Sequence, residues 1–143
     1  MTHVADHEVD DLIQEVFLAV FQSAERYRGA SSVRTWIFAI ASNVARANAR
    51  KDKRRREREK LRAVPPITAA GPDDSMIERE MLARLQQALQ ALSHHQRVAF
   101  VMCEVEEIPG TEAAHALGIP TGTLYRRLHE ARKKLRKALE DES

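Results

Sequence analysis

Aromatic residues, glycine and proline are all scarce in this sequence of 143 residues. Phe, Trp and Tyr together make up 5%, and Gly and Pro number 5 each. Sheet-rich folds draw on aromatic strand residues and on turns rich in glycine and proline, so we do not expect one. Ala, Leu, Arg and Glu are abundant instead, and these residues favour helices. The composition therefore predicts an all-α protein of small domains, too short for a large enzyme core.

Cysteine and long apolar runs are also lacking. Cys103 is the single cysteine, so an internal disulfide is excluded. The longest apolar run covers only 98–103, far short of the roughly 20 residues that a membrane-spanning helix needs. The N-terminus is acidic and polar, unlike a signal sequence. We therefore expect a cytoplasmic protein with no membrane insertion.

The residue patterns that support catalysis or metal binding are missing as well. The histidines are scattered, and the adjacent His94 and His95 diverge on a helix, so they would chelate a metal poorly. The glycines are too dispersed for a phosphate-binding loop. No nucleophile with a base, carboxylate pair or set of metal ligands has a suitable spacing. We expect no enzyme activity, no metal and no cofactor.

The net charge is only +2, but the charges are sorted into blocks. The first fifteen or so residues carry acids and no Lys or Arg, whereas 46–62 and 126–137 are strongly basic. Two separated basic stripes predict a polyanion contacted in two places. Either stripe taken alone is more typical of a solvated helix face.

The N-terminal part predicts two helices. Apolar residues from Val9 onward recur at a spacing of three and four, which predicts a helix with one buried face. That face comprises Leu12, Ile13, Val16, Phe17, Val20 and Phe21. The opposite face is acidic with an exposed leucine, and comprises Asp10, Asp11, Gln14, Glu15, Leu18 and Gln22. Gly29 permits a turn, and Ser31 and Ser32 offer caps for a second helix. Its expected inner face comprises Val33, Trp36, Ile37, Ile40, Ala41 and Val44.

Residues 63–73 combine three prolines with a glycine and lack periodicity, which predicts a flexible linker. We therefore expect two domains, 1–62 and 74–143. Ser75 with Glu78, and Ser93 with Gln96, form capping-box patterns at the starts of two helices. The core face of the first would comprise Met81, Leu82, Leu85, Leu89 and Leu92.

The end of the chain predicts a helix-turn-helix. After a helix over 94–105, we expect a short helix over 111–117, a left-handed turn at Gly118 and a last helix from about 121. The last helix has a basic outer side, and in a helix-turn-helix this helix enters the DNA major groove. A similar three-helix core also occurs in protein-binding modules, so this part alone favours duplex DNA only moderately.

Aromatic residues lie among arginines in the N-terminal part. Tyr27, Trp36 and Phe38 occur close to Arg26, Arg28, Arg34 and Arg46. Rings that stack on unpaired bases, with cations for the phosphates, are typical of single-strand recognition. The alternative is that Trp36 belongs to the core of a small domain.

Five segments together resemble one known family. DLIQEVF at 11–17 and YRGASSVRTWIFAIASN at 27–43 resemble the second conserved region of extracytoplasmic-function (ECF) sigma factors. LSHHQR at 92–97, LGIPTGTL at 117–124 and LHEAR at 128–132 resemble the fourth region. The segments occur in the family's order, on either side of a linker in the family's position.

This resemblance implies a function and its residues. The family docks on core RNA polymerase through an acidic helix face, here Asp11, Gln14, Glu15 and Leu18. It recognises the minus-ten element as an unpaired strand, which implies Tyr27, Arg28, Ser31, Arg34, Trp36 and Asn43. It reads the minus-thirty-five element as duplex, which implies Thr123, Tyr125, Arg126, Arg127, His129 and Arg132. The implied partners are core polymerase and promoter DNA, and an anti-sigma factor is a candidate third.

Three features depart from the family pattern. Only ten residues precede Asp11, where the family has further helices, so we expect a truncated first domain. Either the gene begins upstream of Met1, or the protein is a reduced variant that exposes apolar residues such as Val9 and Val16 until a partner covers them. The family's Ser-Tyr-Glu-Glu reads PGTE at 109–112, which removes a serine cap worth about 1 kcal/mol unless Thr111 replaces it. Tyr125 and Arg126 differ from the commonest residues at the recognition face, so the promoter sequence cannot be inferred.

Two other functions stay open at this point. A stand-alone helix-turn-helix regulator would use the C-terminal domain but would leave the face from Asp11 to Leu18 unexplained. A truncated sigma factor could act as an interaction protein that sequesters core polymerase or an anti-sigma factor.

Overall fold

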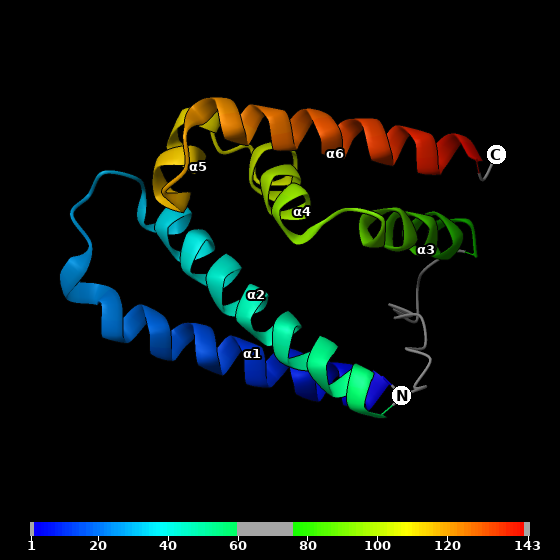
Figure 1. Cartoon of the computed structure of the whole chain (residues 1–143), viewed down its shortest axis with the longest axis horizontal. Helices are drawn as coiled ribbons and strands as arrows, with labels where there is room; N and C mark the ends of the chain where they lie inside the picture. Colours follow the sequence, from blue (N-terminus) through cyan, green and yellow to red (C-terminus); the bar gives the residue numbers. More distant parts are fainter. Residues whose placement is uncertain (1, 60–75, 142–143) are drawn as a thin grey trace.

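The computed structural model describes residues 2–59 and 76–141, and every regular element in these two stretches is helical (Figure 1). The helices are α1 (Thr2–Ser23), η1 (Ala24–Arg26), α2 (Val33–Glu59), α3 (Met76–Gln90), α4 (His94–Phe100), η2 (Val101–Val105), α5 (Gly110–Leu117) and α6 (Thr121–Asp141). The all-α prediction is confirmed. The predicted linker at 63–73 and the predicted cap at Ser75 lie outside the described residues. No helix in the described stretches is long and apolar enough to cross a membrane.

The N-terminal part is an antiparallel pair of helices, α1 and α2, which lie side by side (Figure 1). Gly29, at a φ of 76°, turns the chain between them, as predicted. Ser32 caps α2, because its Oγ accepts a hydrogen bond from the Thr35 N–H at 3.1 Å. At the other end of the pair, Arg55 of α2 forms an ion pair with Glu8 of α1, with 3.6 Å between Arg55 Nη2 and Glu8 Oε1.

The predicted buried face of α1 is only partly covered. Val16 is half-buried, but Val9, Phe17 and Phe21 are 50%, 69% and 82% exposed. Ile13 of the same face is 46% exposed, so the prediction that Ile13, Phe17 and Phe21 are buried is wrong for this structure. The physical reason is that a single helix, α2, packs along α1 and covers only one edge of its apolar face.

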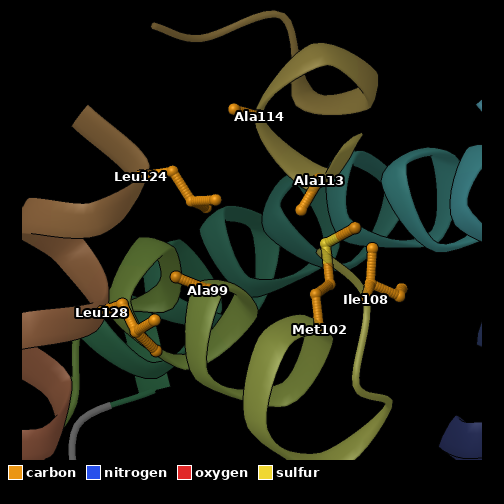
Figure 2. Packing of buried hydrophobic residues seen from close by; sticks show 7 residues of the cluster. All are labelled: Ala99, Met102, Ile108, Ala113, Ala114, Leu124 and Leu128. Carbon is orange, nitrogen blue, oxygen red and sulfur yellow. The ribbon is translucent and has the colours of Figure 1, made fainter. Parts of the chain in front are cut away.

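The C-terminal part has a compact core between α4, η2, α5 and α6 (Figure 2). Met102 and Leu124 are its largest fully buried hydrophobic side chains. Gly118 adopts a φ of 69° at the end of α5, and its N–H donates to the carbonyl of His115 at 3.1 Å. This left-handed turn aims α6 across α5 and confirms the predicted helix-turn-helix.

The helices α4 and α5 of this part differ in how their N-termini are capped. Ser93 and Gln96 form the predicted capping box at the start of α4. Pro109 precedes α5 and no side chain caps that helix, so Thr111 does not replace the missing serine. The α4 helix continues into η2 as a π-helical turn, in which the Glu106 N–H donates to the carbonyl of Val101 at 2.9 Å.

Helix α3 packs along α6 through a second buried cluster, made of Ala88, Leu92, Ala131 and Leu135. The predicted core face of α3 is correct at Leu92 but wrong at its other end, since Met81, Leu82 and Leu85 are 64%, 37% and 41% exposed. Within the described residues, the last turns of α3 contribute Ala88 and the partly buried Leu89 to this cluster.

The N-terminal half (8–59) and the C-terminal half (76–141) also contact each other, which the sequence did not predict. The start of α2 lies against α5 (Figure 1). The Phe38 side chain of α2 packs on the C-terminal core.

Candidate polymerase and nucleic-acid interfaces

The predicted polymerase-docking residues are exposed together on α1. The spacing of these residues along the helix, by three, one and three positions, places them on one side of α1. They are Asp11, Gln14, Glu15 and Leu18. Leu18 is 57% exposed, as the sequence predicted. An acidic helix face with an uncovered leucine offers both charge and apolar area to a basic, apolar partner surface.

The loop between α1 and α2 and the first turn of α2 hold the two aromatic residues that are predicted to contact unpaired DNA, Tyr27 in the loop and Trp36 in α2. The Tyr27 hydroxyl donates to the carbonyl of Ser31 at 2.6 Å. The Tyr27 ring lies against the Trp36 ring, with 5.0 Å between centroids and a 48° angle between planes. Both rings are half-buried, whereas Arg28 is exposed beside them. Tyr27 therefore shapes the loop and still offers part of its ring to a ligand.

Arg34 and Asn43 lie where α2 meets the C-terminal half. The Arg34 guanidinium forms an ion pair with Glu106, and its Cζ lies 5.8 Å from the centroid of the Phe38 ring. Asn43 lines a cleft between the halves. The other residues of this cleft are Ser42, Arg46, His95, Val98, Leu117, Ile119 and Arg127. The structure thus brings predicted minus-ten and minus-thirty-five residues together across one cleft.

The outer side of α6 carries the predicted duplex-reading residues. Tyr125, Arg126 and His129 are exposed, and Thr123 and Arg127 are half-buried. The Tyr125 ring rests on Gly110 of α5, where a Cβ atom would lie 2.7 Å from Tyr125 Cζ. The absence of a side chain at Gly110 therefore lets this ring approach the start of α5 closely.

The cleft is strongly positive. Burial, followed by the charges of Arg127, Arg46 and Arg50, lowers the pKa of His95. Burial also lowers the pKa of His94, assisted by His95, Arg97 and Arg46, whereas the backbone of Ser42 acts in the opposite direction. Each of these shifts favours the neutral imidazole, first because burial removes solvent from the charged form and then because cations from both halves lie nearby.

Sequence reasoning missed the residues that join the two halves. Thr35 is only 1% exposed, and Glu112 binds both it and Ser32. A threonine inside the apolar pattern of α2 was the one available signal, because a buried hydroxyl requires a polar partner. Glu104 was also missed, and it pairs with Arg132 of the predicted recognition surface.

A helix pair with an acidic face, joined to a helix-turn-helix with a basic outer side, defines a two-part DNA-binding protein. Comparison with known proteins identifies it further. Residues 3–55 match the family described as Sigma-70 region 2, and residues 82–135 match Sigma-70, region 4. The chain belongs to the sigma-70 family, and its relatives place it among the ECF sigma factors.

The curated relatives include two ECF sigma factors. The chain is 31% identical over 136 residues to the ECF RNA polymerase sigma factor SigE of Mycolicibacterium smegmatis. This match covers 91% of the chain and 51% of SigE. The chain is also 29% identical over 144 residues to the ECF RNA polymerase sigma factor SigW of Bacillus subtilis. That match covers 94% of the chain and 77% of SigW. The chain thus spans about half the length of one relative and about three quarters of the other.

Solved structures with a similar fold include one sigma factor complex. It is the sigma factor RpoE in complex with the anti-sigma factor NepR from Bartonella quintana, with a TM-score of 0.69 and 23% identity. The match covers 94% of this chain and 82% of the RpoE chain.

Proposed function

We propose that this chain is a promoter-specificity subunit that acts in the cytoplasm and has no catalytic activity of its own. The face of α1 from Asp11 to Leu18 docks on core RNA polymerase. The loop around Tyr27 and the first turns of α2 bind the unpaired minus-ten strand. The outer side of α6 reads the minus-thirty-five duplex.

One observation carries this proposal: α6 has a buried inner side and an exposed polar outer side in a helix-turn-helix frame. Leu124, Leu128 and Ala131 are at most 4% exposed, whereas Tyr125, Arg126 and His129 face solvent. Arginine and histidine side chains on such a helix can donate to base edges and phosphates in the major groove. The exposed acidic face of α1 supports a second, protein partner.

Transcription from a library of duplex templates tests the proposal. Purified bacterial core polymerase is incubated with the library, with and without the chain, and the transcripts are sequenced. We expect the chain to produce run-off transcripts that share two upstream motifs. Duplex binding without core-dependent transcripts would instead indicate a stand-alone helix-turn-helix regulator. Binding to core polymerase with neither transcripts nor duplex binding would indicate an interaction protein.

A further inference from the structure

We propose that Glu112 is a latch that holds the C-terminal half closed on the first turn of α2, and that promoter DNA and this closed arrangement compete for Arg34, Asn43 and Arg127. The competition rests on the proposed function, whereas the latch itself does not.

The Glu112 carboxylate completes the cap of α2 from the other half of the molecule. Its Oε1 accepts from the backbone N–H of Ser32 at 2.9 Å, and its Oε2 accepts from the Thr35 hydroxyl at 3.2 Å. In a capping box, the third residue of the helix supplies the carboxylate or amide that binds the cap residue's N–H. That residue is Thr35 here, which cannot reach back in this way, so Glu112 takes its place. A carboxylate at a helix N-terminus also interacts favourably with the helix dipole.

Two further contacts reinforce the closed arrangement. Glu106 pairs with Arg34 of α2. Phe38 packs against the buried cluster that includes Met102 and Leu124. Closure therefore combines two carboxylates with one aromatic contact, and it engages Arg34, which was predicted to bind the minus-ten strand.

The cleft beside these contacts opposes closure. Arg46 from α2 faces His95 from α4 and Arg127 from α6. The guanidinium groups of Arg46 and Arg127 carry like charges and repel each other. Burial, followed by these two charges, lowers the pKa of His95 between them. A DNA phosphate would relieve the repulsion, but unpaired DNA at Asn43 and duplex DNA at Arg127 cannot both enter while the two residues line one cleft. Binding both promoter elements therefore requires the halves to separate, and by linkage DNA should favour the open state.

Energy transfer within the full chain measures closure without DNA. Trp36, the single tryptophan, is the donor, and an acceptor dye on Lys133→Cys in a Cys103→Ala background reports the C-terminal half. Glu112→Ala removes the latch. Glu106→Gln weakens closure without touching the cap of α2. Glu107→Gln is the matched control, because Glu107 is exposed in the same loop as Glu106 and makes neither contact across the interface.

We expect Glu112→Ala and Glu106→Gln to lower the energy transfer and Glu107→Gln to leave it unchanged. Loss of a charge-assisted hydrogen bond should shift the opening equilibrium on the order of tenfold. Circular dichroism checks that each variant keeps its helices, and if Glu112→Ala loses them, Glu106→Gln alone decides. If the deciding variant keeps its helices and its energy transfer equals that of the parent chain, the proposal that Glu112 is a latch is overturned.

The competition is tested with a random-sequence duplex carrying a single-stranded overhang. In the parent chain, this probe should lower the energy transfer, and less so as salt rises. The open variants should bind it several-fold more tightly than Glu107→Gln. If the open variants show lower energy transfer but bind the probe no more tightly than Glu107→Gln, the proposed competition is overturned. A failure of the transcription assay, by contrast, would contradict the proposed function and leave the energy-transfer result standing.

Discussion

Arg132 of the recognition helix donates to Glu104 of η2, with 2.7 Å between Arg132 Nε and Glu104 Oε1. The two side chains are 52% and 35% exposed, so solvent screens the pair and its contribution to stability is at most about 1 kcal/mol. The pair instead fixes the direction of a guanidinium that was predicted to contact the minus-thirty-five element.

Removing Glu104 should therefore change DNA binding more than stability. We expect Glu104→Ala to raise the affinity for random duplex DNA a few-fold at low salt, because it removes a negative charge and frees Arg132 for phosphate. Fluorescence anisotropy over a salt series measures this. Arg132→Ala should weaken binding and flatten the salt dependence. Equal affinities of the parent and both variants would show that Arg132 does not contact DNA.

The acidic face of α1 predicts a charge-dependent interaction with polymerase. We expect Glu15→Lys to weaken binding to core polymerase by on the order of tenfold, because it reverses a charge at the centre of the exposed face. Glu25→Lys is the matched control, since Glu25 is exposed in η1 outside that face. Pull-down of core polymerase and biolayer interferometry measure the effect. Equal losses in the two variants would indicate a general effect of charge and contradict the assigned face.

His94 and His95 at the start of α4 predict a pH-dependent stability. The folded state lowers the pKa of His94 below its ordinary 6.5, so the unfolded chain takes up a proton first as the pH falls. This contribution to stability is therefore present above pH 6.5 and is lost as the pH falls from there through the lowered pKa of the folded state. Urea denaturation between pH 8 and pH 5.5 should show the loss, and His94→Gln should reduce it. His95 has the same direction of shift, so the double variant should reduce it further.

Local features of the fold could be predicted from the sequence. The capping box of Ser93 and Gln96 and the turn at Gly118 depend on residues a few positions apart, and both occur as expected. The helix-turn-helix follows from them, because these signals set where α4 begins and where α5 ends.

The covering of apolar faces could not be predicted in the same way. Periodicity places Phe17 and Phe21 on one face with the half-buried Val16 and Val20, but it does not say whether another helix reaches that face. The same holds for Met81 on α3. The contact between Ser32 and Glu112 joins residues 80 positions apart, and neither residue carries a local signal for it. The residues assigned to polymerase and DNA contacts came from the family resemblance, and their roles remain predictions.

The loop at Tyr27 predicts a defect in promoter opening. We expect Tyr27→Ala and Asn43→Ala to lower the permanganate reactivity of unpaired thymines and the run-off yield on a duplex promoter, on the order of tenfold for Tyr27→Ala. A ring stacked on a base contributes about 1–3 kcal/mol, and an amide offers both a donor and an acceptor to a base edge. A template supplied as a pre-melted bubble should restore part of the yield, because the defect follows closed-complex formation.

Tyr27→Phe separates stacking from loop structure. It keeps the ring against Trp36 and loses only the hydrogen bond to the Ser31 carbonyl. If the ring acts on DNA, Tyr27→Phe should open promoters far better than Tyr27→Ala, and both variants should bind core polymerase like the parent chain. If Tyr27 only packs the loop, Tyr27→Ala should lose thermal stability and core binding together with opening. Normal opening of a duplex promoter by both Tyr27→Ala and Asn43→Ala would exclude the single-strand role, and the basic residues of α2 from Arg46 onward would then be the next candidates for that contact.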